Sequence, residues 1–518
     1  MKTDISLIRN LGFKWHSRNG ISVKGYFYID GKYMPTESVP GIFDNVRSKE
    51  DFIGLASRIN GCFAIVMICD DWVYAAADTL RSFPIFHTMK DEVFYLSDDA
   101  ESIAVKTKFI EINKNGLIDY LHSGCVFFNE TLVDNIFQIS AMHCLVYDKT
   151  GCKAEYIRYK TLFTKDYAIY DKGSAAKELD DVIMKAAKRL VVSLEGRTAV
   201  LALSGGVDSR ACLMMLKMLN YENVICFTYG WRNSPELKPA IKVAEYFGCR
   251  HILIEYDRKK WRGTYGDKES LDYIRYAGNL TSIAHMQEHY IIRKLKADKA
   301  IPGDSVFVTG HIGVIANGKF DEDKEYTRDQ IYEIMWKYYM KLYSLKGRRK
   351  DYYYHRFAEY FPEGEKFTGR QAERIYENAG YDNVRGKHII NSHRLYEMYG
   401  FEWRAPLMDY EVMDSFESMA PVIRDRKKEF FINYVTERTG KDNKAADLKA
   451  PYIVKAFRNL RNPVYAIITP ARLLFSGYKD CLLPPFPIRQ YRFLRRFYSY
   501  CALQEIKLIK GWLEADVD

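Results

Sequence analysis

The stretch AVLALSGGVDSRACLMML, residues 199–216, constrains the fold more than any other part of the chain. Its apolar run from Val200 to Leu203 suits a buried strand, and it stops at the polar, glycine-containing hexad SGGVDS, residues 204–209. An apolar pattern with helical spacing follows at once. A strand that enters a helix through so short a loop is typical of a parallel α/β sheet. We therefore expect an α/β fold around this hexad.

The chain of 518 residues carries three kinds of pattern, which predict three segments. Residues 1–160 contain short β-rich runs between turn residues, which favours an antiparallel, layered domain; the runs are 21–29, 62–69, 72–77, 93–97 and 143–148. Residues 161–450 open with helical spacing over 174–194, alternate strands and helices from 198 to 256, and then look largely helical. Residues 451–518 form a basic, aromatic C-terminal region.

The residue types in the hexad suit a phosphate group. Gly205 and Gly206 let the backbone turn and approach a ligand, and their N–H groups and the helix start form an anion-binding nest. Ser204 and Ser209 add hydroxyl donors. Asp208 repels phosphate unless a cation intervenes, which indicates Mg²⁺. No lysine follows the glycines, so this is not a Walker loop. The alternative is an ordinary turn between a strand and a helix.

At this point the sequence resembles the asparagine synthetase-like enzymes, members of the PP-loop ATP pyrophosphatases, whose loop reads S-G-G-x-D-S. The resemblance continues after the second strand and on both sides of it. The positions that match are Glu236, Ala240, Ala244, Gly248 and His251; Gly61, Phe63, Asp78, Arg81 and Pro84; and Arg404, Pro406, Leu407 and Asp409. It covers residues 20–440 and implies an Ntn-like antiparallel domain followed by a PP-loop, adenine nucleotide α-hydrolase-like domain.

The resemblance also implies a site for ATP and Mg²⁺. Leu203 and Tyr229 would line the adenosine pocket, the hexad would hold the pyrophosphate, and Asp208 would bind the metal. A second loop, in VFVTGHIGVIANG, residues 306–318, would contact ATP through Thr309 and Gly310. His311 would stand near the reacting acyl group, where it orients or deprotonates an amine, or it caps a backbone group.

Two further residues carry over from the family. Lys428 matches the catalytic lysine that neutralises charge on the phosphate, although Lys427 beside it leaves the register open. Glu397 stands near an acid that positions or deprotonates the nucleophile, with a helical ion pair to Arg394 as the alternative.

Two departures from the family bear on activity. Glutamine-using members expose a cysteine as residue 1, whereas this sequence starts Met-Lys-Thr, so we expect a degenerate, glutaminase-like domain without glutaminase chemistry. Val314 occupies the place of the second Mg²⁺ ligand, an Asp. Asp321 and Asp323 follow it, either as replacements or as part of an exposed loop.

Composition bears on the partners and the cellular location of the protein. The net charge of +10 fits anionic partners or serves solubility alone. The ten cysteines form no C-x-x-C pair, the start lacks an apolar signal core, and no apolar run approaches the ~20 residues of a membrane span, so we expect a cytoplasmic protein. The arginines of the C-terminal region suit either peripheral membrane contact or packing of that region on the core. No nucleic-acid-binding module is recognisable, so we expect no nucleic-acid partner. A homodimer is left open.

These patterns lead to one expected function and one alternative. The expected function is ATP-dependent formation of an amide: a substrate carboxylate is adenylated, and ammonia or an amine attacks the acyl-adenylate without glutamine as the nitrogen source. The alternative is a catalytically degenerate relative that binds nucleotide as a scaffold or regulatory partner.

Overall fold

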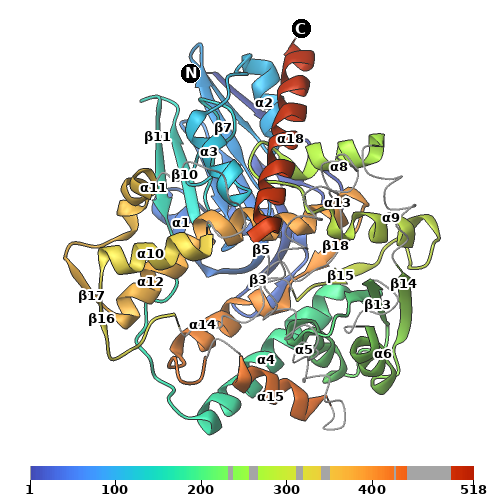
Figure 1. Cartoon of the computed structure of the whole chain (residues 1–518). Helices are drawn as coiled ribbons and strands as arrows, with labels where there is room; N and C mark the ends of the chain where they lie inside the picture. Colours follow the sequence, from blue (N-terminus) through green and yellow to red (C-terminus); the bar gives the residue numbers. More distant parts are fainter. Residues whose placement is uncertain are drawn as a thin grey trace.

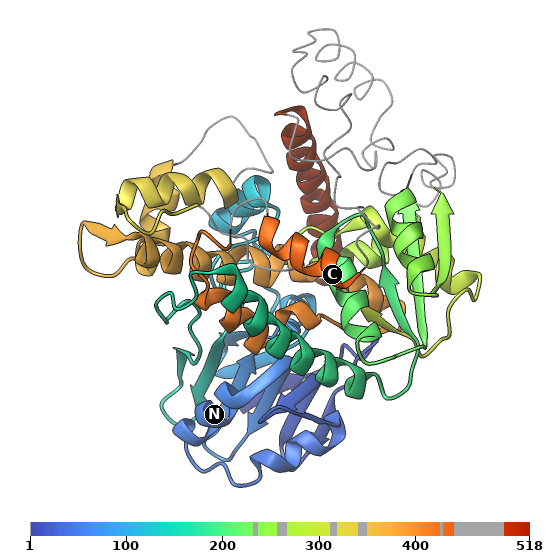
Figure 2. The same cartoon turned by 90° about the horizontal axis from the view of Figure 1, so that it is seen from below.

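The computed structural model of the chain describes residues 2–230, 237–255, 267–310, 319–339, 350–424, 428–439 and 492–517. Figures 1 and 2 show a β-rich N-terminal part packed against a second part that holds a parallel sheet. The C-terminal helix α18 (Arg492–Val517) lies against the N-terminal part in Figure 1.

Two sheets form the N-terminal part. The first has the order β1-β8-β7-β9, and its strands are β1 (Lys2–Ser6), β8 (Val93–Ser97), β7 (Phe86–Lys90) and β9 (Phe137–Gln138). The second has the order β11-β10-β6-β5-β3-β2, with β4 beside β3; its strands are β2 (His16–Arg18), β3 (Ile21–Ile29), β4 (Lys32–Met34), β5 (Ile59–Ile68), β6 (Trp72–Ala77), β10 (His143–Asp148) and β11 (Lys153–Arg158). All pairs are antiparallel except β1 with β8.

The two sheets face each other and helices cover their outer faces. Side chains alternate along β3, so that Tyr26 and Tyr28 join the large cluster shared with the second part, where they contact Trp403 and Ser193, while Ile21, Val23 and Phe27 pack on the opposite face. The outer face of the larger sheet lies under η1 (Thr36–Phe43) and α1 (Lys49–Arg58). The other outer layer contains α2 (Ala100–Thr107) and α3 (Lys114–Ser123). The prediction of an antiparallel, layered domain is confirmed.

The second part is built on a five-stranded parallel sheet. Its order is β14-β13-β12-β15-β18, and its strands are β12 (Ala199–Ala202), β13 (Val224–Gly230), β14 (Arg250–Glu255), β15 (Val306–Val308) and β18 (Glu402–Arg404). One face packs on α4 (Lys172–Leu194), α5 (Val207–Lys217), α6 (Leu237–Tyr246), α14 (Tyr410–Ser418) and α15 (Glu429–Arg438). The parallel α/β prediction is confirmed.

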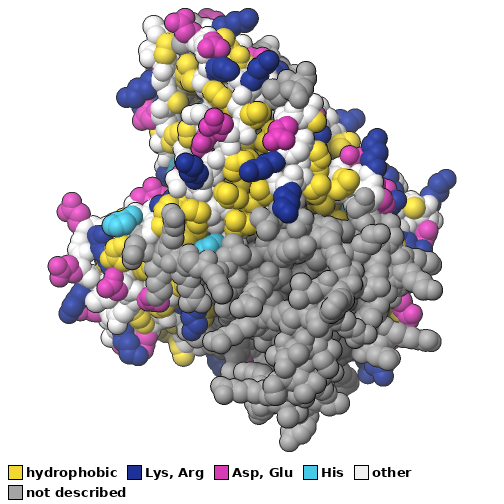
Figure 3. Space-filling model, turned by 45° about the horizontal axis from the view of Figure 1, so that its top comes forward, with side chains coloured by type: hydrophobic (Ala, Val, Ile, Leu, Met, Phe, Trp, Pro, Cys, Tyr) yellow, Lys and Arg dark blue, Asp and Glu magenta, His cyan; other side chains and the backbone are white. Residues whose placement is uncertain are grey.

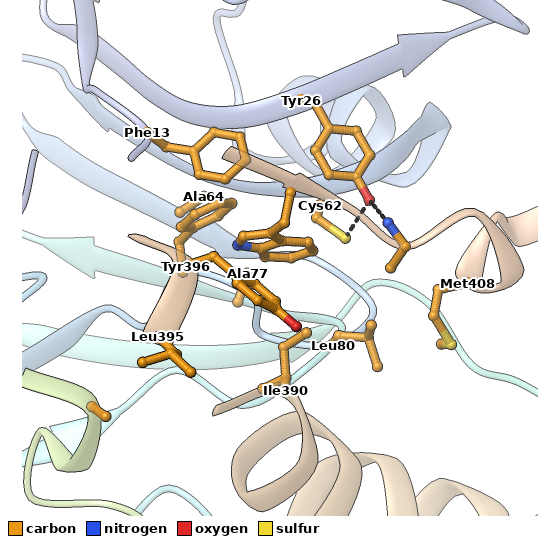
Figure 4. Close-up of a cluster of buried hydrophobic side chains, with 14 of the residues drawn as sticks. Phe13, Tyr26, Cys62, Ala64, Ala77, Leu80, Ile390, Leu395, Tyr396 and Met408 are labelled. Carbon is orange, nitrogen blue, oxygen red and sulfur yellow. Dashed lines mark hydrogen bonds between the residues drawn. The ribbon is translucent and has the colours of Figure 1, made fainter. Parts of the chain in front are cut away.

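The opposite face of the parallel sheet joins the N-terminal part in one apolar cluster. It packs on α8 (Lys268–Gly278), α9 (His289–Ala297) and α13 (Arg394–Met398). Trp403 of β18 has no exposed surface and packs edge-on against Phe13 and Tyr26. Figure 4 shows side chains of both parts converging in this cluster, Tyr26 among them and Tyr396 opposite. The boundary predicted at residue 160 stays a prediction.

The remaining elements extend the second part. They are η2 (Met286–Glu288), β16 (Glu325–Thr327), α10 (Arg328–Tyr339), α11 (Lys350–Arg356), η3 (Phe357–Tyr360), β17 (Lys366–Thr368), α12 (Gly369–Gly380), η4 (Tyr381–Ile389), η5 (Ile390–His393) and η6 (Pro406–Met408). The element η4 is a π-helix, and β16 pairs with β17 in a two-stranded sheet. The sequence predicted neither feature.

Helix α18 packs its apolar face on the N-terminal part. Ala502, Ile506, Ile509 and Leu513 join a cluster with residues of α2 and α3. Its Glu505 is buried and accepts hydrogen bonds from the hydroxyl of Tyr120 at 2.8 Å and from the N–H of Ala284 at 3.4 Å. The helix therefore contacts both parts of the chain.

Two further observations concern the helices and the surface. Within the described ranges no helix is long and apolar enough to cross a membrane. On the face drawn in Figure 3, basic and acidic side chains are interspersed over the upper, described part. The positive net charge does not gather there into a field of one sign.

Candidate nucleotide-binding site

The hexad lies where the sequence predicts it, between the end of β12 and the start of α5. Ser204 and Ser209 hold the turn: their hydroxyls lie 3.2 Å apart, and the N–H of Ser204 donates to Ser209 Oγ at 3.2 Å. The N–H of Gly206 donates to Ser204 Oγ at 3.1 Å. Gly206 is the N-cap of α5, so the helix start faces the loop. This is the geometry expected of an anion-binding loop.

The structure gives a different reason for a glycine at position 206 from the one that the sequence suggested. Its φ is −76°, which any residue adopts, so no left-handed turn requires glycine here. A Cβ at this position would lie 3.0 Å from Ser204 Oγ, which would disturb the hydroxyl that holds the loop. The absence of a side chain therefore keeps the loop open to a ligand.

The predicted metal-binding carboxylate and the predicted catalytic lysine meet at this loop. Lys428 Nζ lies 3.0 and 3.1 Å from the two carboxylate oxygens of Asp208, although 220 positions separate them in the chain. Both side chains remain partly exposed, at 25% for Lys428 and 29% for Asp208. Lys428 precedes α15 and has a left-handed φ of 58°, a strained conformation that is common at functional sites. Lys427, the other predicted register, lies outside the described residues.

The second predicted loop begins beside the first. Thr309 and Gly310 follow β15, the neighbour of β12 in the sheet. A Cβ on Gly310 would lie 2.8 Å from both the carbonyl carbon of Asp208 and the nitrogen of Ser209. The backbone of this loop therefore touches the first turn of α5. The hydroxyl of Thr309 lies 2.7 Å from His393 Nε2. Residues 311–318, which include His311 and Val314, lie outside the described residues.

The two residues predicted to line the adenosine pocket have different surroundings. Leu203 is 1% exposed, and its N–H donates to the carbonyl of Phe227 at 2.8 Å. Its side chain is therefore buried in the core and is not open to a ligand. Tyr229 donates to Glu288 Oε1 at 2.6 Å, and Tyr396 donates to Glu288 Oε2 at 2.8 Å. Sequence reasoning missed Glu288, because no motif marks it and its partners are remote in the chain.

Glu397 does not have the surroundings of a group that contacts substrate. It has no exposed surface, and it pairs with Arg394 at 2.5 Å. It also accepts hydrogen bonds from the indole of Trp403 at 2.8 Å and the hydroxyl of Tyr276 at 3.3 Å. The ion pair to Arg394, the alternative from the sequence, is present, and the carboxylate holds α13 on β18.

Several of the other matching positions make structural contacts. Ala240 and Ala244 are fully buried between α6 and the sheet, as their size predicts, and His251 Nε2 lies 2.8 Å from the hydroxyl of Thr228. Asp409 binds Arg189 of α4 through both oxygens, at 2.7 and 2.8 Å. Glu236 lies outside the described residues.

Asp321 and Asp323 are exposed, and Asp321 pairs with Lys324 at 2.6 Å. Both residues therefore fit the alternative of an exposed loop rather than that of replacement metal ligands. Within the described residues no cluster of three or more His, Cys, Asp or Glu side chains could hold a metal. The metal-binding role predicted for Asp208 stays a prediction.

Comparisons with known proteins agree with this site. Residues 178–430 match the sequence profile of asparagine synthase. The chain is 34% identical over 85 residues to 7-cyano-7-deazaguanine synthase of Coxiella burnetii (strain RSA 331 / Henzerling II), which covers 16% of this chain and 38% of that protein. It is 26% identical over 151 residues to tRNA-specific 2-thiouridylase MnmA of Cupriavidus metallidurans (strain ATCC 43123 / DSM 2839 / NBRC 102507 / CH34), over 27% of this chain and 42% of that protein. The chain thus spans less than half the length of these relatives.

A solved structure, glutamine phosphoribosylpyrophosphate amidotransferase from B. subtilis complexed with ADP and GMP, aligns over 58% of this chain and 64% of that one. Its identity is 12% and its TM-score is 0.19, too low to argue from. The profile match, in contrast, spans the hexad, the second loop and Lys428. Residues 178–430, just under half of the chain, are therefore similar to the asparagine synthase family.

Proposed function

We propose that the chain forms an amide by ATP-dependent adenylation of a carboxylate, followed by attack of ammonia or an amine. The observation that carries the proposal is the meeting of Asp208 and Lys428 at the phosphate loop. A scaffold that only bound nucleotide would need the loop but not a lysine held there in a strained conformation.

Each described group has a task in this reaction. The N–H groups at the start of α5 bind the pyrophosphate of ATP, and Ser204 and Ser209 orient them. Lys428, partly exposed, is free to exchange Asp208 for a phosphate oxygen and to stabilise the negative charge that develops as the acyl group is activated. The ion pair keeps the ammonium beside the loop before nucleotide arrives.

The site fits Mg²⁺ that arrives with ATP better than a resident metal. Asp208 supplies one oxygen ligand, and Mg²⁺ commonly takes one or two carboxylates together with phosphates and water. Bound there, the ion would neutralise charge between Asp208 and the phosphates.

Most cysteines of the N-terminal part are buried, which supports a nitrogen source other than glutamine. Cys69 is half-buried and Cys152 is exposed. Cys62, Cys125 and Cys144 are buried, and burial raises the pKa of each thiol, that of Cys125 to about 11. Such thiols are mostly protonated near neutral pH and are poor nucleophiles. We propose ammonia or an amine-bearing substrate as the direct donor.

The test is ATP–pyrophosphate exchange against a panel of carboxylic acids. We expect exchange with at least one acid, and loss of exchange in Asp208→Asn and Lys428→Met. Lys217→Met is the matched control, since Lys217 lies on α5 but pairs with Glu222 at 2.8 Å, and it should exchange like the wild type. Nucleotide binding by Lys428→Met should persist, because the nest is backbone.

The same assay decides between catalyst and scaffold. A protein that binds MgATP but is inert with every acid, and that gains exchange on Val314→Asp, is a degenerate enzyme in which a carboxylate ligand has been lost. A catalyst adapted to valine should keep its exchange or lose some of it in Val314→Asp, because the new carboxylate adds uncompensated charge.

A further inference from the structure

A buried arginine in the N-terminal part has an edge of its guanidinium without a partner. Arg81 lies in the loop between β6 and β7 and is 3% exposed. Its Nη1 donates to the carbonyl of Gly386, in η4, at 3.2 Å. Its Nε and Nη2 are buried and have no hydrogen-bond partner, and among the described residues Arg81 forms no ion pair.

The two nitrogens left over form the edge that recognises an oxyanion. Nε–H and Nη2–H of a guanidinium point in parallel, and this fork matches two oxygens of a carboxylate or phosphate. A charge-assisted bidentate pair is among the strongest polar contacts in proteins. The position of the free edge therefore specifies the chemistry of what would satisfy it.

The groups beside Arg81 add positive charge. Arg394 is 5% exposed; its Nη1 binds Glu397, but its Nη2 is buried without a partner. Lys387 is 1% exposed and donates to the carbonyls of Val126 and Phe128. Burial and the charge of Arg394 lower the pKa of Arg81 to about 9, and burial and the charge of Arg81 lower that of Lys387 to about 7.

The nearby carboxylates are already engaged. Asp78 accepts hydrogen bonds from the N–H groups of Phe63, Leu80 and Ser82. Asp119 pairs with Arg356 at 3.0 Å through Oδ2, while its Oδ1 is buried without a hydrogen-bond partner. Among the described residues neither carboxylate forms an ion pair with Arg81.

The backbone around Arg81 is fixed from both sides. Arg81 has a left-handed φ of 52°, which costs free energy in a non-glycine residue and is typical of clamps and functional loops. A Cβ on Gly386 would lie 3.3 Å from the carbonyl oxygen of Leu80 and 2.6 Å from that of Tyr381, so η4 packs directly on this loop. Long π-helical turns are rare and often occur at functional sites.

A buried charge without a partner of opposite charge costs free energy, and a bound anion would reduce that cost. We propose that a small oxyanion, a carboxylate or an inorganic oxyanion, binds between the two parts of the chain on the free edge of Arg81, with Arg394 as its second donor. This site is separate from the phosphate loop and does not depend on nucleotide binding.

The test measures the melting temperature of the full chain in a chloride buffer without oxyanions, at constant ionic strength. Acetate, malonate, phosphate and sulfate are titrated separately. We expect a saturable rise in melting temperature with oxyanion, and an apparent affinity at least about tenfold weaker in Arg81→Met. In the buffer alone Arg81→Met should be as stable as the wild type or more so, because no unpaired charge is then buried.

Controls make the outcomes separable. Arg293→Gln removes an arginine that pairs with Asp267 at 2.6 Å and should keep the response. A response to carboxylates alone identifies an organic acid as the ligand, and a response to phosphate and sulfate alone identifies an inorganic oxyanion. Equal shifts by all salts in wild type and Arg81→Met, or no shift at all, overturn the proposal. If Arg81→Met does not fold, Arg81→Lys, which keeps the charge without the fork, is compared by equilibrium dialysis with labelled phosphate and acetate.

Discussion

Substitution of Gly310 by alanine tests whether the two loops act as one site. The new Cβ would lie 2.8 Å from backbone atoms of Asp208 and Ser209, about 0.6 Å inside the 3.4 Å at which ordinary contact begins. These neighbours are backbone of the first turn of α5 and cannot rotate away, so the loops must separate by that amount. Overpacking of this kind costs about 1–3 kcal/mol of stability.

The effect on the reaction should exceed the effect on stability. A shift of about 1 Å in a positioning group can lower the rate about 10²-fold, so we expect exchange to fall by about one to two orders of magnitude. MgATP affinity and pyrophosphate exchange are measured beside thermal unfolding. Gly303→Ala, in the turn before β15 and with open space around it, is the control. Unchanged exchange and affinity in a folded Gly310→Ala protein would show that the second loop does not position the first.

Three further outcomes are expected, two from described contacts and one from the proposed nitrogen source. Burial raises the pKa of Glu505 to about 8 from its ordinary 4.5, so the folded chain holds a proton that the unfolded chain has lost. Stability should therefore fall as pH rises from about 4.5 to about 8, and Glu505→Gln should flatten the melting temperature over that range; an unchanged slope contradicts this. Glu288→Gln leaves one tyrosine hydroxyl facing an amide N–H₂, which should cost about 1–3 kcal/mol in thermal unfolding and weaken ATP binding, whereas wild-type behaviour removes Glu288 from the site. Incubation with glutamine should release no glutamate above background, and stoichiometrically inhibitable release would refute the proposed nitrogen source.

Local patterns predicted the strands well because their causes are local. The predicted runs 21–29, 72–77, 93–97 and 143–148 coincide with β3, β6, β8 and β10, where alternating burial and turn residues set the ends. The hexad was equally readable, since Gly, Ser and Asp at that spacing serve a strand-to-helix loop. Asp208 and Lys428 could be paired only through the family resemblance, because their contact spans most of the second part.

Features that depend on remote partners could not be predicted from the sequence. Glu288 is an ordinary glutamate until Tyr229 and Tyr396 approach it from two other elements. The unpaired edge of Arg81 depends on two contacts that the sequence does not reveal. Nη1 donates to the carbonyl of Gly386, and Asp78 accepts hydrogen bonds from backbone N–H groups, so that Nε and Nη2 have no partner.

Glu397 and Lys428 show what the structure adds to a resemblance. Both were assigned from neighbouring sequence, and each has an ion pair partner in the fold. Glu397 has no exposed surface, and its oxygens accept two hydrogen bonds in addition to the ion pair. If Glu397 gave up Arg394 for another partner, the arginine charge would be buried and unpaired, at a cost of several kcal/mol. Lys428 pairs at a loop open to solvent, where an exposed ion pair is worth at most about 1 kcal/mol and a phosphate oxygen can replace its partner. For the proposed reaction, this difference in burial favours Lys428 over Glu397 as the residue that takes part.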